Sequence, residues 1–189
     1  MRIVLPVLLG LGLLVPAPAA TLPRPAPEIE FVSQIGERIR LSELKPNVVV
    51  VEFLLTGCPT CKNSARLLSR LQTEYSEKGL RVIGLAIDEG AGPKIGGFIQ
   101  ETKATFPIGA YDYMKAREFM QVPAVVNMMM PQLAIIDRNG VVRDQHTAVD
   151  KWMAPAVEEA NLRKLIDQLL AEPARPAAKA GARKAAPKK

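Results

Sequence analysis

Long apolar runs alternate with helix-like periodic stretches along this chain, and the pattern predicts an α/β domain. Residues 48–55 and 80–88 are mostly apolar, as in strands that are buried on both faces of a parallel sheet. Between these runs, apolar positions recur at helical spacing as far as Gly79, and glycine commonly ends a helix. Strand, helix and strand in this order predict a right-handed parallel βαβ unit.

Shorter elements precede and follow this unit. The Asn139-Gly140 pair between two apolar runs is a strong signal for a β-hairpin. Leucine and isoleucine residues share one face of 155–170 and predict an amphipathic helix there. The other expected elements are a hairpin of strands 30–32 and 38–41, a helix over 94–102, a short strand over 106–108, a helix over 114–120, and hairpin strands over 132–137 and 141–146.

The first twenty residues have the pattern of a secretory signal peptide. A positive start is followed by the apolar stretch 3–15 and by the small residues Ala17-Pro18-Ala19. An uncleaved membrane anchor or a core helix is the alternative, but the stretch is short for a bilayer span and contains proline. We therefore expect an exported protein in the periplasm or elsewhere outside the cytoplasm, anchored to the membrane only if the signal stays uncleaved.

The rest of the chain divides into an extended lead-in over 21–27, one domain over 28–171 and a basic tail over 172–189. The net charge of +6 comes from the tail, which holds six cations without a balancing acid after Glu172. A stretch of Pro, Ala and Lys cannot bury enough apolar surface to become ordered, so we expect disorder. The tail either binds an anionic surface or simply aids solubility; the second interpretation is preferred, and no nucleic-acid partner is expected.

Candidate chemistry is concentrated in the only two cysteines, Cys58-Pro59-Thr60-Cys61, between the first apolar run and its helix. Two thiols at this spacing can close a disulfide, and a helix N-terminus stabilises a thiolate. A purely structural disulfide is the main alternative, although so short a loop contributes little stability. A zinc site would need four ligands, and the chain has only these cysteines and His146. We therefore expect a redox-active disulfide, with no metal and no other cofactor.

Several motifs together resemble one known family. Residues 51–61, Phe106-Pro107, Asp112 and 131–140 resemble the exported thioredoxin-like redoxins of the TlpA, ResA and DsbE type. The resemblance covers about 28–170. It implies a thioredoxin fold, a three-layer α/β/α arrangement with a mixed central sheet, an N-terminal β-hairpin and a central insertion.

The same resemblance implies an extracytoplasmic thiol-disulfide oxidoreductase that exchanges disulfides with protein partners, as a monomer. Cys58 would be the exposed nucleophile and Cys61 the buried thiol that resolves the mixed disulfide. Glu52 occupies the position of a buried acid that exchanges a proton with Cys61; a solvent-facing strand-edge glutamate is the alternative. The direction of transfer stays open, and a reductant would need a membrane electron donor.

The partner-binding side of the site is also carried over from the family. Pro131 would be a cis-proline facing the thiols, with the Met130 backbone offered to an extended partner segment; an ordinary strand-start proline is the alternative. Pro59 and Thr60 lie within the redox motif. Gly57 replaces the usual tryptophan before the first cysteine, which removes an aromatic shield.

Three further features are departures from the family or side chains without a clear role. Arg66 replaces a usual proline, so we expect a straighter helix. The run Met128-Met129-Met130 could form an apolar docking lip or a Cu(I) site, but core filling is preferred. For His146 we expect a solvated side chain on the last strand.

Two other functions remain as alternatives. A thiol peroxidase shares this fold, but Leu54 and Leu55 replace the proline and threonine of the peroxidase motif. A non-enzymatic copper-binding or chaperone module would use the methionine run together with the cysteines.

Overall fold

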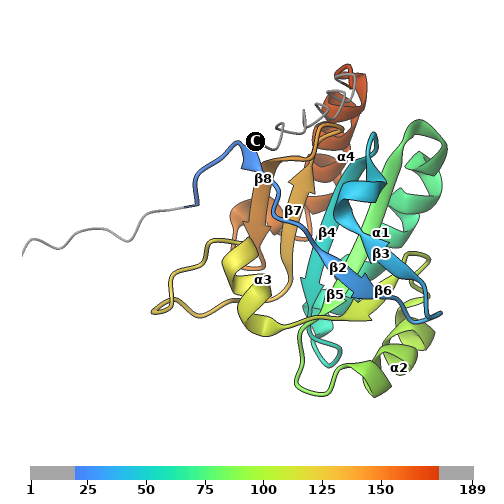
Figure 1. The fold of residues 1–189 in the computed structure, drawn as a ribbon, viewed down its shortest axis with the longest axis vertical. Helices are drawn as coiled ribbons and strands as arrows, with labels where there is room; N and C mark the ends of the chain where they lie inside the picture. The colour runs from blue at the N-terminus through green and yellow to red at the C-terminus, as the bar shows by residue number, and fades with distance from the viewer. Residues whose placement is uncertain (1–19, 175–189) are drawn as a thin grey trace, which may run out of the picture.

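The computed structural model describes residues 20–174 (Figure 1). The predicted signal peptide lies outside this range except for its last residue, as does nearly all of the predicted disordered tail. Within 20–174, none of the helices has both the length and the apolar character needed to span a bilayer.

A six-stranded mixed sheet forms the centre of the domain. Its strands, in spatial order, are β1 (Arg24–Pro25), β8 (Val141–Thr147), β7 (Gln132–Ile136), β4 (Val48–Leu54), β5 (Leu80–Ala86) and β6 (Ile108–Ala110). β4, β5 and β6 run parallel, whereas β7, β8 and β1 pair antiparallel with their neighbours. Every residue of β4 and β7 is buried, as expected for central strands.

Helices cover one face of the sheet, and a helix with a hairpin covers the other (Figure 1). On the first face, α1 (Pro59–Tyr75) lies beside α4 (Glu158–Ala171), with an ion pair of 2.9 Å between Arg70 and Glu159, and α2 (Gly92–Thr102) packs on α1. On the other face are α3 (Tyr113–Phe119) and the hairpin of β2 (Glu30–Val32) and β3 (Arg38–Arg40). This arrangement is the predicted three-layer fold with its N-terminal hairpin.

Opposite faces of β4 supply the two halves of the core. The Phe53 ring packs on the Phe119 ring of α3, with centroids 5.5 Å apart. Side chains alternate along a strand, so the neighbouring residue Glu52 lies on the face covered by α1 and α4. The single acid of this otherwise apolar strand is thus placed under the two helices that frame the thiols.

The predicted order of elements is confirmed, and the bounds of several elements differ from the prediction by one to three residues. The short strand is β6, because Pro107 cannot donate to a ladder and Phe106 packs against Gly84 instead. α1 ends at Tyr75 and continues as the 3-10 turn Ser76–Lys78 before left-handed Gly79. α4 begins at Glu158, three residues later than predicted. The lead-in contributes β1, which pairs with β8.

The start of the predicted basic tail contacts strand β8. Glu172, the first residue assigned to the tail, accepts hydrogen bonds from the Arg143 guanidinium at 2.6 and 3.2 Å. An ion pair that joins β8 to the end of α4 belongs to the folded domain.

Candidate functional site

The two thiols lie where β4 ends and α1 begins. Thr56 holds the connecting loop, because its backbone N–H and its hydroxyl both donate to the Asp88 carboxylate at 2.8 and 3.1 Å. Cys58 then caps α1, and its sulfur accepts the backbone N–H of Cys61 at 3.2 Å. The motif therefore occupies the helix N-terminus, as the sequence predicts, with a sulfur as the capping acceptor.

Cys58 is half-buried, and its surroundings favour the thiolate. Burial alone would raise its pKa, but hydrogen bonds from the side chains and backbone N–H groups of Cys61 and Thr60 outweigh this and lower it. The Thr60 hydroxyl lies 3.0 Å from the sulfur. A lowered pKa on an accessible thiol is the condition for a nucleophile near neutral pH.

Cys61 has the opposite environment. It is fully buried, and burial together with the hydrogen bond to Cys58 raises its pKa strongly. Both cysteines are free thiols in this structure. An accessible, acidic thiol beside a buried, weakly acidic one is an arrangement that can attack an external disulfide first and resolve it second.

Met130 and Pro131 lie opposite the thiols, and the peptide bond between them is cis, as predicted. The Met130 carbonyl oxygen lies 3.1 Å from the Thr60 hydroxyl oxygen and 3.9 Å from the Cys58 sulfur. Just before it, the Met129 carbonyl accepts the Gln132 amide at 2.9 Å and the Thr147 hydroxyl at 2.8 Å. The loop backbone is therefore fixed against the redox motif from both sides.

Glu52 is fully buried beneath the motif, so a solvent-facing strand-edge glutamate is excluded. Burial raises its pKa to about 8, helped by the charges of Glu158 and Cys58 and opposed by the nearby Ser64 hydroxyl. Among residues 20–174, neither of its oxygens has a hydrogen-bond partner. A carboxyl that titrates near neutral pH, with charge coupling to both cysteines, can take up and release a proton during thiol chemistry.

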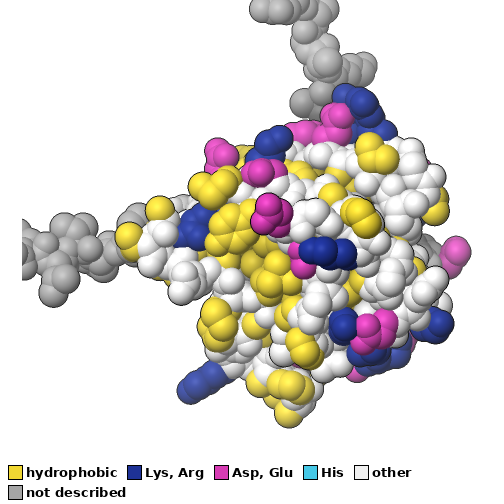
Figure 2. All heavy atoms as spheres, turned by 90° about the horizontal axis from the view of Figure 1, so that it is seen from below, with side chains coloured by type: hydrophobic (Ala, Val, Ile, Leu, Met, Phe, Trp, Pro, Cys, Tyr) yellow, Lys and Arg dark blue, Asp and Glu magenta, His cyan; other side chains and the backbone are white. Residues whose placement is uncertain are grey.

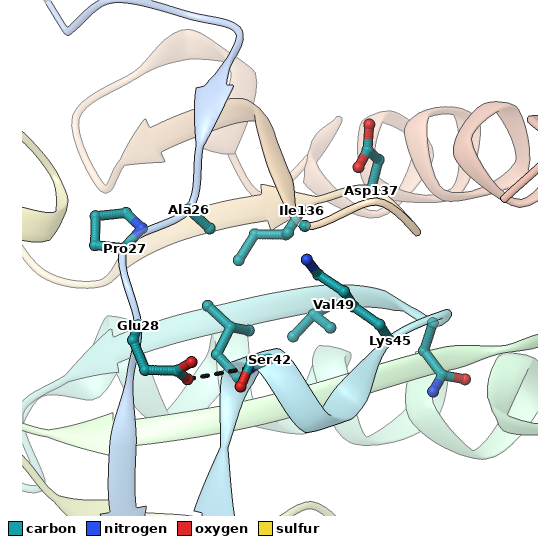
Figure 3. A pocket seen from close by; sticks show the side chains of 11 residues that line it. Ala26, Pro27, Glu28, Ser42, Lys45, Val49, Ile136 and Asp137 are labelled. Atoms are coloured by element: carbon teal, nitrogen blue, oxygen red, sulfur yellow. Dashed lines mark hydrogen bonds between the residues drawn. The ribbon is translucent and has the colours of Figure 1, made fainter. Parts of the chain in front are cut away.

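A cavity of about 340 Å³ opens beside the thiols on the α1 and α4 side. Thr60 and Pro131 form its edge nearest the motif, and Ser64 and Glu158 line it farther along. The cavity is large enough for a partner side chain or several waters. A smaller cavity of about 50 Å³ lies by Val49 at the start of β4, at the far end of the strand from the thiols; Glu28, Ser42 and Lys45 line it (Figure 3).

Exposed apolar side chains surround the thiol end of the molecule. Figure 2, which views this end, shows hydrophobic side chains gathered in the middle of the face with a few charged ones among them. Gly57 is exposed, and a Cβ placed on it would contact nothing within 4 Å. The exposed apolar residues of α3 and of the loop before Pro131 are Tyr113, Met114, Val125, Val126 and Met129.

The preferred interpretation of the methionine run as core filling was wrong for Met129 only, because Met130 belongs to the core and partly buried Met128 packs against it. Only Met130 is buried; Met128 is partly buried and Met129 is 50% exposed. Buried Arg117 of α3 holds the loop instead, by donating to the carbonyls of Pro123 and Val126. The loop therefore presents its apolar side chains outward because its carbonyls point inward.

His146 was also expected to be solvated, and this was wrong. Its side chain is 12% exposed and stacks on Trp152 with ring centroids 3.8 Å apart, between carboxylate oxygens of Asp144 at 3.2 Å and Asp150 at 3.4 Å. The aromatic partner comes from the 3-10 turn Lys151–Met153, which the sequence pattern does not reveal. Within the described part of the chain, no three His, Cys, Asp or Glu side chains group as metal ligands would.

Sequence reasoning missed three contributors to the site. The Thr56 and Asp88 pair could have been suspected from an acid at the end of β5, next to the motif strand. Ser64 and Glu158 carry no motif, and only the packing of α4 against α1 and β4 brings them near Glu52. Such proximity between distant segments is not encoded in local periodicity.

Comparison with known proteins assigns a family to this site. The Redoxin family model matches residues 21–166. The thiol-disulfide oxidoreductase ResA of Bacillus thuringiensis subsp. konkukian is 28% identical over 117 residues, which cover 62% of this chain and 64% of the relative. This chain thus spans less than two thirds of that relative's length. The thioredoxin-like protein YneN of Bacillus subtilis is 26% identical over 64% of this chain and 68% of the relative.

Solved structures agree on the fold. A Chlorobium tepidum protein described as the thiol:disulfide interchange protein DsbE superposes with a TM-score of 0.67 at 24% identity, over 78% of this chain and 96% of that one. This likeness confirms the predicted thioredoxin fold. Because the family model covers the redox motif, the buried acid and the cis-proline together, the chain belongs to the Redoxin family.

Proposed function

We propose that this protein is a thiol-disulfide oxidoreductase that exchanges disulfides with protein partners outside the cytoplasm. The observation that carries the proposal is the asymmetry of the thiol pair. Cys58 is accessible, hydrogen-bonded as a thiolate and placed beside the cis-proline, whereas Cys61 is buried and held protonated. The signal-peptide pattern of residues 1–20 supports export.

The first step is attack on a partner. The Cys58 thiolate attacks one sulfur of a partner disulfide, so that a Cys58–partner bond forms, the partner's own S–S bond breaks, and its second sulfur leaves as a thiolate. Thr60 and the Cys61 N–H, which stabilise the thiolate beforehand, lie within 3.2 Å of the reacting sulfur. Their hydrogen bonds keep Cys58 ionised while the partner docks.

The second step is resolution. Glu52, which is partly ionised near neutral pH because its pKa is about 8, takes the proton of the Cys61 thiol, and the resulting thiolate attacks the Cys58 sulfur. A Cys58–Cys61 disulfide forms, the mixed disulfide breaks, and the partner's remaining sulfur leaves as a thiolate. The two partner thiolates take protons from water, so the partner has gained two electrons and two protons. The same steps in reverse oxidise a partner, and renewed reduction requires an external dithiol donor, which for an exported protein would be membrane-bound.

The surface around the thiols supports a protein partner. An extended segment can lie along Met130 and Pro131, where backbone groups face the motif. The exposed apolar residues of α3 and the neighbouring loop provide further contact area, and the adjacent cavity can receive one side chain. With Gly57 in place of a bulky residue, the approach to Cys58 is open.

Mixed-disulfide trapping tests the proposal in the exporting cell. The Cys61→Ser variant should accumulate covalent complexes that a reductant dissolves, because the resolving thiol is absent. The matched control Cys58→Ser, Cys61→Ser should trap nothing. Absence of complexes in Cys61→Ser, together with failure of the wild-type dithiol to reduce insulin, would eliminate the oxidoreductase proposal; fast reduction of hydrogen peroxide instead would favour the thiol peroxidase.

A further inference from the structure

Three buried polar groups without partners lie between the thiols and the neighbouring cavity. Both Glu52 oxygens, the Ser64 hydroxyl and the Glu158 Oε1 atom are buried and have no partner within hydrogen-bond distance among residues 20–174, although the Ser64 hydroxyl is near enough to Glu52 to lower its pKa. Buried polar groups are almost always hydrogen-bonded to protein or water. Three such groups next to one another therefore indicate that water binds between them, and bound water can carry protons from one group to the next.

The three groups are connected in space. Ser64 is three residues after Cys61 on α1 and lies close enough to Glu52 to influence its pKa. Ser64 and Glu158 both line the cavity of about 340 Å³, and the charge of Glu158 acts on Glu52. Glu158 is the first residue of α4, whose contact with β4 brings it to the acid below the thiols. The order of groups is Glu52, Ser64, Glu158.

The cavity provides the route to solvent. Its volume of about 340 Å³ is enough for several waters. Ser64 is 2% exposed, whereas Glu158 is only partly buried, so the two span the depth of the cavity. Burial nevertheless raises the pKa of Glu158, which allows this carboxyl to carry a proton at a higher pH than a surface glutamate.

We propose that Glu158 is the outer proton-relay residue of the redox site, exchanging the proton of Glu52 with solvent through Ser64 and cavity water. The proposal rests on the proposed function, because it concerns the proton that Cys61 releases. Glu158 touches neither sulfur in this role and acts only through Glu52.

The proton balance of resolution then closes. Cys61 loses a proton to Glu52, and the Cys61 thiolate displaces the partner from Cys58. Glu52 next passes its proton through the Ser64 hydroxyl and water to the Glu158 carboxylate, which releases it to bulk water. Because negative Glu158 raises the pKa of Glu52, ionised Glu158 also makes the Glu52 carboxylate a stronger base toward Cys61.

The other charged side chains that line the cavity form ion pairs with each other or with Arg163. Arg70 and Glu159 also line the cavity, but Glu159 pairs with Arg70 at 2.9 Å and with Arg163 at 2.8 Å. On the inner side, the groups whose charges act on Glu52 are Cys58 and Glu158, and Glu52 in turn acts on Cys61. Glu159 therefore offers a matched control: an acid one residue away, at the same cavity, already tied to two arginines.

The two phases of thionitrobenzoate release measure separately the attack by Cys58 and the resolution by Cys61, of which only the second depends on the relay. Reduced protein mixed with dithiobis-nitrobenzoate releases a first equivalent when Cys58 attacks and a second when Cys61 resolves. Glu158→Gln should slow the second phase about tenfold and leave the first unchanged, because only resolution needs the proton to leave. Imidazole, small enough for the cavity, should restore the second phase with increasing concentration in Glu158→Gln and leave the wild-type rate unaltered.

Two further variants complete the test. Glu159→Gln should retain the wild-type second phase. Ser64→Ala, which interrupts the relay from the inner side, should slow the second phase and respond to imidazole, and it serves if Glu158→Gln does not fold. An unaltered second phase in the folded Glu158→Gln protein, slowing without imidazole rescue, or equal slowing in Glu159→Gln would overturn the relay. Failure of the wild-type protein to release a second equivalent would instead refute the proposed function.

Discussion

Replacing Glu52 with glutamine should remove most of the pH dependence of stability between weakly acidic and weakly alkaline pH. In the folded protein the pKa of Glu52 is about 8, against an ordinary value of 4.5. An unfolded chain therefore ionises this carboxyl well before the folded one does. Since the folded state binds the extra proton, its stability falls as pH rises through this window.

The magnitude follows from the two pKa values. Below pH 4.5 the carboxyl is protonated in both the folded and the unfolded state, so it does not change the free energy of unfolding. Between pH 4.5 and 8 the free energy of unfolding falls by about 1.4 kcal/mol per pH unit, and above pH 8 it falls no further. The loss is about 3 kcal/mol at pH 7 and about 5 kcal/mol above pH 8. This loss is a large part of the free energy of unfolding of a typical domain, which is about 5–15 kcal/mol.

Urea unfolding of the reduced protein across this pH range measures the effect. The free energy of unfolding of Glu52→Gln minus that of the wild type should grow by about 5 kcal/mol from the acidic to the alkaline limit. Both proteins keep the same thiols, so cysteine titration largely cancels in the difference. The exposed acid Glu77 supplies the control, and Glu77→Gln should follow the wild type. A difference that stays constant with pH would refute a raised pKa at Glu52.

Three further outcomes are expected. Thr60→Val should raise the pKa of Cys58 and slow its attack on a small disulfide about fivefold, because it removes a hydrogen bond to the thiolate. The control Thr73→Val, which removes a hydroxyl contact farther along α1, should change neither. Ultraviolet absorbance of the thiolate against pH measures the pKa. Arg117→Ala should destabilise the protein by about 2 kcal/mol or more and speed hydrogen exchange in the loop before Pro131, since buried carbonyls lose their donor. Gly57→Trp should fold normally, because its Cβ meets open space, and should weaken partner trapping by Cys61→Ser; unchanged trapping would show that partners do not dock over this position.

The elements of the domain were predictable because their signals are local. Each of three patterns predicts its element from a short stretch of sequence: the apolar run of β4, the periodic apolar positions of α1 and the Asn139-Gly140 turn. Strand β1 was not, because a two-residue strand within a proline-containing lead-in depends on the edge that β8 offers. The exposure of Met129 depends similarly on Arg117, whose hydrogen bonds turn the loop carbonyls inward.

Some residues of the site were predictable from the sequence and others were not. Cys58, Cys61 and Pro131 could be assigned because the resemblance supplies their spacing, and Glu52 could be suspected because an acid interrupts an apolar strand. The surroundings of Glu52 could not be assigned, because Ser64 and Glu158 look like ordinary polar positions on two amphipathic helices. Their chemistry arises only when α4 packs on β4 and joins α1 through the ion pair of Arg70 and Glu159.

Equilibration of the purified domain with glutathione redox buffers shows whether Cys58 and Cys61 form a reversible redox pair. After acid quenching, mass spectrometry distinguishes the dithiol, the Cys58–Cys61 disulfide and a glutathione adduct. We expect one two-electron transition between dithiol and disulfide, with the adduct accumulating only in Cys61→Ser and on Cys58. A wild-type protein that remains a dithiol in every buffer, or that stops at a stable glutathione adduct without closing the Cys58–Cys61 bond, would rule out a redox-active Cys58–Cys61 pair.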